Sequence, residues 1–255
     1  MSRNDPPSQT PPVLEVEGVS LVRRGRKILD EVSLCIQQPG QVWGILGANG
    51  AGKTCLLKVI TGLMRANSGV VRVQGEVLPP GVMPSRVGAL IEEPRFYPWL
   101  TGRDNLLVFA GGDNVKSARV DELLSLVGLR ERANDKVRIY SQGMRQRLGI
   151  ARALLSDPAL VLLDEPANGL DPEGIAWLRA LVAALRSKGT TVVITSHVLS
   201  EVQRTCDTVV VMSAGRIFAE GPMASVLSGV SSLEELYFRL AERWTAPDAT
   251  GSFHG

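Results

Sequence analysis

The stretch Gly47-Ala48-Asn49-Gly50-Ala51-Gly52-Lys53-Thr54 follows the apolar run 42–46 and matches the pattern G-x-x-x-x-G-K-[ST]. In such a loop the glycines let successive backbone N–H groups turn inward around phosphate oxygens. Lys53 adds a positive charge for the terminal phosphates, and Thr54 offers a hydroxyl to Mg²⁺. Residues 54–60 are typical of a helix whose N-terminal end would face the phosphates. The order strand, loop, helix predicts a nucleoside triphosphate site, with expected contacts from Gly47, Asn49, Gly50, Ala51, Gly52, Lys53, Thr54 and Cys55.

Composition limits the class of protein. The 255 residues are enough for one large α/β domain, or for a core domain with a small subdomain. The net charge of +2 is not gathered into a basic stripe with interleaved aromatic residues, so nucleic acid is not an expected partner. Cys35, Cys55 and Cys206 lie far apart, which indicates neither a metal site nor a disulfide framework and fits a reducing cytosol. No apolar run approaches the roughly 20 residues that a membrane-spanning helix needs.

The pattern of polar and apolar residues divides the chain into segments. We expect residues 1–12 and 245–255 to be disordered, because neither can bury enough apolar surface to offset the entropy of ordering. One folded domain is expected over residues 13–244. Within it, residues 92–150 carry apolar residues mostly at helical spacing and predict an inserted helical subdomain.

Strand and helix patterns alternate through the rest of the domain, which implies a parallel core sheet. The first strands alternate polar and apolar residues and are joined by a short turn, so an antiparallel β-layer should begin the fold. The predicted class is α/β: a P-loop NTPase core with a mostly parallel sheet, an N-terminal antiparallel β-layer and an inserted helical subdomain. The predicted strands are 13–19, 28–36, 42–46, 70–73, 87–91, 159–164 and 190–195, with a closing hairpin at 207–212 and 216–219, and the predicted helices are 54–60, 104–110, 115–127, 143–156 and 172–187.

Two carboxylates, Asp164 and Glu165, stand at the C-terminal end of the apolar run 160–163. Ligands of open α/β sheets bind at that end of the strands. Asp164 is suited to orient Mg²⁺ through its water shell, and Glu165 to take a proton from a water that attacks the γ-phosphate. A solvated strand end is the plain alternative, but beside a phosphate loop the pair predicts hydrolysis of a nucleoside triphosphate.

The run Tyr140-Ser141-Gln142-Gly143-Met144-Arg145-Gln146-Arg147 precedes the acidic strand end. Ser141 can cap the helix that begins here and Gly143 leaves backbone exposed, so the helix presents N–H groups to an anion. This run resembles the signature sequence of ATP-binding cassette (ABC) proteins. The resemblance extends over about residues 13–220, which is nearly all of the predicted domain.

The resemblance implies roles for further residues. Asn168-Gly169-Leu170-Asp171 resembles the loop that crosses a dimer interface, so Asp171 joins the expected nucleotide contacts. His197 follows residues 190–195, interpreted as the last core strand, and resembles the switch histidine that contacts the γ-phosphate. The family implies a dimer, formed by two copies or with a homologous ATPase, in which the phosphate loop of one subunit and the signature of the other clasp each ATP. The implied set is Lys53, Glu165 and His197 for catalysis, Thr54 and Asp164 for Mg²⁺, and Ser141, Gln142 and Gly143 acting in trans.

Two positions depart from the family pattern. Members usually have an aromatic residue that stacks on adenine in the N-terminal β-layer, where this chain has Arg23; the guanidinium plane of Arg23 or Arg24 can take that place. Many members have Gln after the strand at 87–91, where this chain has Glu92. Glu92 still offers an oxygen to Mg²⁺ or to the attacking water. Its negative charge predicts a steeper dependence on free Mg²⁺ than Gln would show.

Residues 90–102 resemble the corresponding segment of the bacitracin and lantibiotic resistance group of ABC-2-type exporter ATPases, as does Met144 after the signature glycine. The segment is rich in aromatic residues, including Phe96, Tyr97 and Trp99. We expect these side chains either to line a groove for a cytoplasmic helix of a permease or to form a satellite core beneath the helical subdomain.

The resemblance implies the ATP-binding and ATP-hydrolysing subunit of an ABC transporter, which powers export of a small molecule or peptide, such as an antibiotic, through a separate ABC-2-type membrane permease. The chain would then lie in the cytoplasm, peripheral on the inner face of the cell membrane, and the cargo would be selected by the permease. The alternative is a soluble ABC ATPase that uses the same site in assembly, repair or translation.

Overall fold

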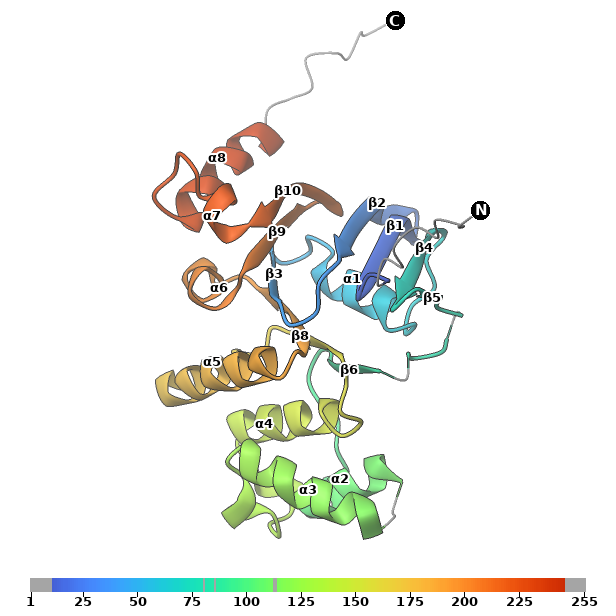
Figure 1. Ribbon diagram of the computed structural model, residues 1–255, viewed down its shortest axis with the longest axis vertical. Coiled ribbons are helices and arrows are strands. Elements are labelled where there is room, and N and C mark those ends of the chain that lie inside the picture. The colour runs from blue at the N-terminus through green and yellow to red at the C-terminus, as the bar shows by residue number, and fades with distance from the viewer. Residues whose placement is uncertain (1–10, 80, 85, 112–113, 246–255) are drawn as a thin grey trace, which may run out of the picture.

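Figure 1 shows β-sheets in the upper part of the molecule and a group of helices in the lower part. The computed structural model describes residues 11–79, 81–84, 86–111 and 114–245. Of the segments predicted to be disordered, residues 1–10 and 246–255 lie outside the described residues, and Thr245 is the last residue of a helix. Within the described part of the chain, no helix is both long and apolar enough to cross a membrane.

The predicted strands and helices occur in the predicted order, and the structure adds further elements at Glu76–Val77 and after residue 197. The strands are β1 (Leu14–Arg23), β2 (Arg26–Ile36), β3 (Val42–Leu46), β4 (Ser68–Val73), β5 (Glu76–Val77), β6 (Val87–Leu90), β7 (Leu160–Asp164), β8 (Thr191–Ser196), β9 (Thr208–Ser213) and β10 (Arg216–Pro222). The helices are α1 (Lys53–Ile60), α2 (Gly102–Ala110), α3 (Asn114–Leu126), α4 (Gln142–Ala153), α5 (Pro172–Ser187), α6 (Leu199–Thr205), α7 (Met223–Val226) and α8 (Leu233–Thr245), with short 3₁₀ helices at Arg130–Arg132 and Val137–Ile139.

The central sheet has the strand order β10-β9-β3-β8-β7-β6. The strands from β9 to β6 run parallel, and β10 pairs antiparallel with β9 at the edge. The predicted closing hairpin therefore extends the central sheet, and the interpretation of residues 190–195 as the last core strand is wrong. Residues 208–212 of β9 are buried at every position, which requires the cover on both faces that a place beside β3 provides.

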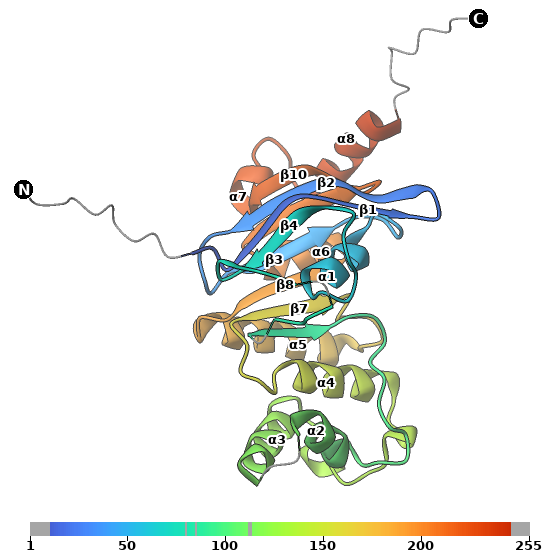
Figure 2. The ribbon, with the colours of Figure 1, turned by 90° about the vertical axis from the view of Figure 1, so that its right-hand side faces the viewer.

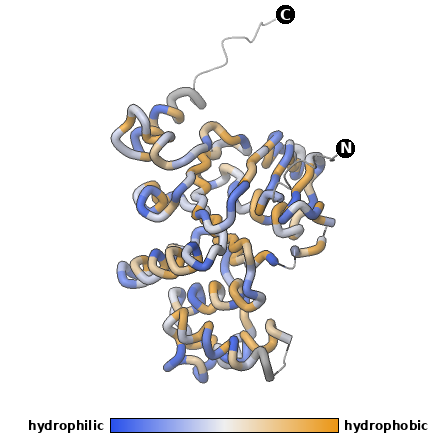
Figure 3. Tube along the Cα trace, in the orientation of Figure 1, coloured by the Kyte–Doolittle hydropathy of each residue, from blue (hydrophilic) through white to orange (hydrophobic). Residues whose placement is uncertain are grey.

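Alternate residues of the central strands face two separate hydrophobic cores. Val161 and Leu163 of β7 pack with α4, α5 and α6, whereas Leu160 and Leu162 pack with α1 and the second sheet. Because successive side chains of a strand point to opposite faces, a strand covered on both faces is apolar at every position. Figure 3 shows hydrophobic colouring along these central strands.

The second sheet is the predicted antiparallel β-layer, with the order β2-β1-β4-β5. In Figure 2 it forms a layer of its own over the central sheet. Leu14, Val16 and Leu21 of β1 are buried in the core that this layer shares with α1, while the polar residues between them are more exposed. The alternation of burial explains why this sheet could be predicted from the sequence.

The segment predicted as a helical subdomain contains α2, α3 and α4, which contact one another through buried residues such as Leu106, Val120 and Leu148. The predicted helix at 143–156 ends earlier, at Ala153. Asp157 has φ +50° and is followed by Pro158, and the chain turns there to enter β7. Proline disfavours a helical conformation at the residue before it, so the helix must stop before the turn.

Helices after residue 197 were not predicted. Helix α8 packs against α6, and the N–H of Leu233 donates to Gln203 Oε1 at 3.0 Å. Leu233 is buried, and Leu236, Tyr237 and Leu240 pack on the same core. These apolar residues recur at helical spacing, so the helix could have been predicted from the sequence.

Candidate active site

The candidate site lies where β3, β8 and β7, neighbours in the central sheet, reach their carboxyl ends. Leu46 at the end of β3 pairs with Ser196, and Asp164 at the end of β7 pairs with Thr195. Parallel strands end at the same edge of a sheet. The phosphate loop, the acidic pair and His197 are therefore brought together although they are far apart in the sequence.

Backbone geometry explains the glycines of the phosphate loop. Gly50 has φ +85° and Gly52 has φ +105°, which L side chains rarely adopt. A Cβ at Gly52 would also lie 2.9 Å from Ile28 O, and a Cβ at Gly47 would lie 2.4 Å from Met212 O. The loop thus packs between β2 and the end of β9. Helix α1 begins directly after it, and the N–H groups of its first turn have no acceptor within the helix.

Lys53 is a buried cation at the centre of the site. Its Nζ donates to Gly47 O at 2.7 Å and to Ala48 O at 3.3 Å, and it lies 3.3 Å from Glu165 Oε1. The other carboxylate oxygen of Glu165, Oε2, lies 2.7 Å from Nδ1 of His197. Glu165 therefore joins the phosphate loop to the histidine after β8. A carboxylate in this position is suited to accept a proton from a bound water.

Asp164 is buried and accepts hydrogen bonds on both carboxylate oxygens. Thr54 Oγ1 donates to Oδ2 at 2.8 Å, and Thr195 Oγ1 donates to Oδ1 at 2.6 Å. Thr54 and Asp164 thus present hydroxyl and carboxylate oxygens side by side, which are the ligands that Mg²⁺ prefers. The donor set fits the predicted metal. In the part of the chain that the structure describes, no cluster of three or more His, Cys, Asp or Glu residues could hold a metal ion.

Sequence reasoning missed Thr195. Its hydroxyl also accepts the backbone N–H of Glu165 at 2.9 Å, so it contacts both acidic residues. The available signal was a hydroxyl residue at the end of the strand predicted at 190–195. Its use depended on knowing the register of the two strands.

The signature and the loop after the acidic pair lie side by side. Ser141 caps α4 by accepting the N–H of Met144 at 3.2 Å, and Asp171 caps α5 by accepting the N–H of Gly174 at 2.7 Å. A Cβ at Gly143 would lie 3.3 Å from Gly169 O. Gln142 and the acidic pair line the same cavity, whose volume is about 250 Å³. Its lining residues are Glu92, Glu93, Pro94, Gln142, Arg145, Gln146, Asp164, Glu165 and Asn168.

No hydrogen bond among the described residues joins Ser141, Gly143 or Asp171 to the phosphate loop of the same chain.

The side chain of Glu92 pairs with Lys58 of α1 rather than with Thr54 or Asp164, and it is 62% exposed. Glu92 has φ +58°, and it lines the cavity beside the acidic pair.

Arg23 is exposed at the tip of the β1–β2 hairpin, where it pairs across the strands with Arg26. The same hairpin reaches the phosphate loop through Ile28, whose carbonyl oxygen approaches Gly52. Arg23 thus lies on the hairpin that borders the loop. Its side chain makes no ion pair with another described residue.

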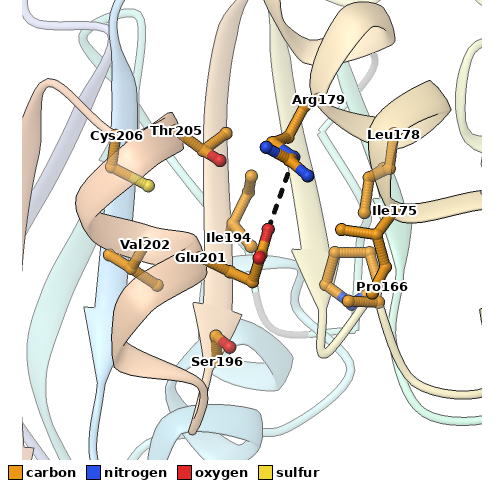
Figure 4. Close-up of a pocket in the computed structure, with 11 residues that line it drawn as sticks. Pro166, Ile175, Leu178, Arg179, Ile194, Ser196, Glu201, Val202, Thr205 and Cys206 are labelled. Atoms are coloured by element: carbon orange, nitrogen blue, oxygen red, sulfur yellow. Dashed lines mark ion pairs between the residues drawn. The ribbon is translucent and has the colours of Figure 1, made fainter. Parts of the chain in front are cut away.

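A smaller cavity lies behind the site, between α5, α6 and β8 (Figure 4). Pro166, next to Glu165, and Ser196, next to His197, are among its lining residues, and an ion pair between Arg179 and Glu201 crosses it at 3.5 Å. Its volume of about 30 Å³ is enough for water and too small for a nucleotide.

Comparison with known proteins gives concordant results. Residues 29–168 match a family described as ABC transporter. The bacitracin transport ATP-binding protein BcrA of Bacillus licheniformis is 39% identical over 215 residues, which are 82% of this chain and 70% of BcrA. The lantibiotic transport ATP-binding protein SrtF of Streptococcus pyogenes is 36% identical over 225 residues, which are 88% of this chain and 96% of SrtF. A solved structure of the ATP-binding subunit of an ABC transporter has a TM-score of 0.81 at 30% identity, covering 90% of this chain and 99% of that one.

Proposed function

The chain belongs to the ABC transporter family as an ATP-hydrolysing cassette, and from this premise we propose that it powers export of a small molecule or peptide through a separate ABC-2-type permease. The observation that carries the catalytic part of the proposal is the chain of contacts from Lys53 through Glu165 to His197 at the strand ends. The export role is supported by similarity to bacitracin and lantibiotic transport proteins.

In the proposed nucleotide complex, the phosphates of ATP lie against the loop at 47–54 and the N-terminus of α1. Lys53 Nζ is buried within the loop and binds the β- and γ-phosphates. Thr54 and Asp164 hold Mg²⁺, which neutralises phosphate charge when bound. Glu92 offers a further oxygen from the adjoining cavity wall. Arg23 supplies its guanidinium plane to adenine in place of the usual aromatic ring.

For hydrolysis, Glu165 is the proposed general base. Its carboxylate takes a proton from the water that attacks the γ-phosphate, and Lys53 Nζ lies 3.3 Å from that carboxylate. His197 presents Nδ1 to Glu165, so Nε2 is the nitrogen left to contact the γ-phosphate. The three side chains therefore act on one end of the nucleotide.

Ser141, Gln142 and Gly143 are proposed to act on the nucleotide of a second subunit. The lack of a hydrogen bond from Ser141 or Gly143 to the phosphate loop of the same chain, within the described residues, fits a role in trans. Asp171 caps the helix next to this signature and would lie at the interface. A homodimer is sufficient because one chain carries every motif, and a homologous ATPase could replace one copy.

The aromatic residues after Glu92 are proposed to bind a cytoplasmic helix of the permease. Trp99 is 64% exposed and Tyr97 is 43% exposed, whereas Phe96 packs against the main core. Exposure therefore fits a role for Tyr97 and Trp99 in partner binding, whereas Phe96 packs inward against the core of the domain. A cavity of about 470 Å³ is lined by Phe96 and Pro98, the neighbours of Tyr97 in the chain, and it shares Glu92 with the cavity at the acidic pair. The chain would then lie on the cytoplasmic face of the membrane.

The test uses a tagged Glu165→Gln protein, trapped with ATP and purified from detergent-solubilised native membranes. We expect a polytopic membrane protein to co-purify, and Trp99→Ala in the same background to release it. Trp99→Ala alone should keep its fold and ATPase activity. Phe238→Ala is the matched control, because Phe238 is 60% exposed on α8, away from the groove. Recovery of ribosomes, DNA or assembly factors from the soluble fraction alone would contradict the transporter role.

A further inference from the structure

The hydroxyl of Thr195 contacts both acidic residues of the site. Oγ1 donates to Asp164 Oδ1 at 2.6 Å and accepts the backbone N–H of Glu165 at 2.9 Å. An ionised carboxylate accepts hydrogen bonds but cannot donate them, so the Thr195 hydroxyl donates its proton to Asp164. A lone pair of the hydroxyl oxygen then accepts the backbone N–H of Glu165. Thr195 is fully buried, and neither bond competes with bulk water.

Thr195 holds Asp164 on the side away from the phosphate loop. The opposite oxygen, Oδ2, is held by Thr54, which belongs to the loop and is a proposed Mg²⁺ ligand. Thr54 therefore responds directly to nucleotide and metal, whereas Thr195 is fixed in β8 by its register with Asp164. The bond from Thr195 sets the plane of the carboxylate without depending on the metal.

Thr195 also supports an unfavourable backbone conformation at Glu165. Glu165 has φ +47°, a left-handed conformation that L side chains rarely adopt and that persists only where neighbouring groups enforce it. The N–H of Glu165 donates to Thr195, and the carbonyl of Glu165 accepts the N–H of Asn168 at 3.1 Å. In this conformation the Glu165 carboxylate reaches both Lys53 and His197.

We propose that Thr195 is a positioning residue for ATP hydrolysis, which orients Asp164 for Mg²⁺ and holds Glu165 in the conformation that aims its carboxylate at the attacking water. This inference rests on the roles of Asp164 and Glu165 in the proposed function. The competing explanation is that Thr195 only satisfies a buried carboxylate. Loss of the hydroxyl would then lower stability and leave the dependence on Mg²⁺ unchanged.

The experiment compares Thr195→Val, which removes the hydroxyl at nearly constant volume, with Thr195→Ser, which keeps it. The matched control is Thr191→Val. Thr191 is also fully buried in β8, but its hydroxyl accepts the N–H of Gly40 at 3.2 Å, at the opposite end of the strand. For each protein we would measure ADP binding in EDTA and in Mg²⁺, ATPase activity against free Mg²⁺, and thermal unfolding.

Thr195→Val should bind ADP in EDTA as the wild type does, lose turnover by roughly tenfold or more, and need several-fold more free Mg²⁺. Thr195→Ser should keep the turnover and the Mg²⁺ requirement of the wild type, and Thr191→Val should lose stability alone. A Thr195→Val protein with wild-type turnover and Mg²⁺ dependence, or a Thr191→Val protein with the same defects, would overturn the inference. A wild-type protein without Mg²⁺-dependent turnover would overturn the proposed function as well.

Discussion

Replacing Gly52 by alanine tests whether the phosphate loop needs glycine for its backbone geometry. The φ of +105° costs an L residue about 1–2 kcal/mol, and the new Cβ meets Ile28 O at 2.9 Å and Leu29 Cδ2 at 3.0 Å. Overpacking of this kind costs about 1–3 kcal/mol. We expect Gly52→Ala to lower the free energy of unfolding by about 2–5 kcal/mol, the sum of the two effects. Relief of the clash would move Lys53 and Thr54, so nucleotide affinity should fall too.

Two other glycines separate the backbone effect from the clash. Gly50 has φ +85° and Gly189 has φ +84°, and a Cβ at either meets nothing within 4 Å. Each alanine variant should therefore lose only about 1–2 kcal/mol. Gly189 lies after α5, away from the loop, so Gly189→Ala should bind ADP normally. Urea unfolding followed by tryptophan fluorescence gives the free energies, and calorimetry gives ADP affinity. If Gly52→Ala were no less stable than Gly50→Ala, the steric argument would be wrong.

Three further predictions concern single side chains. Glu165→Gln should bind ATP but lose turnover by about 10²–10⁴-fold, the range for removing a general base, and substantial turnover in a steady-state assay would refute that role. Glu92→Gln should flatten the dependence of ATPase activity on free Mg²⁺, because it removes a negative charge from the cavity beside the acidic pair; identical Mg²⁺ curves for both proteins would refute this role. Burial raises the pKa of the Cys206 thiol to about 12, and the pKa of Cys35 is raised too, but Cys35 is exposed, so iodoacetamide at pH 8 should modify Cys35 and spare buried Cys206 until denaturant is added. Equal labelling of both in the native protein, measured by peptide mass, would contradict the buried position.

Much of the fold was predictable because its signals are local. The apolar run before the phosphate loop, the alternation in β1 and β2, and the period of α5 each depend on residues close together in the chain. The α/β class, the antiparallel β-layer and the family resemblance are confirmed. The place of β9 beside β3 was not predictable, because a buried strand has the same composition wherever it lies in a parallel sheet.

The candidate site also has features that the sequence predicted and contacts that only the structure shows. The residue pattern pointed to the phosphate loop and the acidic pair, and the family resemblance pointed to His197. The nucleotide, metal and catalytic roles of these residues stay predictions, as do those of Arg23, Glu92, Cys55 and the signature residues. Pairing between distant residues was not visible in the sequence. The structure pairs Glu92 with Lys58 of α1, a contact that the family pattern did not indicate.

The sequence by itself determined which chemical groups this protein has and the strands and helices that carry them, because propensity, capping and hydrophobic period act over a few neighbouring residues. The tertiary structure alone decided which of those groups meet. Thr54 and Asp164 are 110 residues apart and Glu165 and Thr195 are 30 apart, and they touch because packing on both faces of the central sheet selects one strand order and one register.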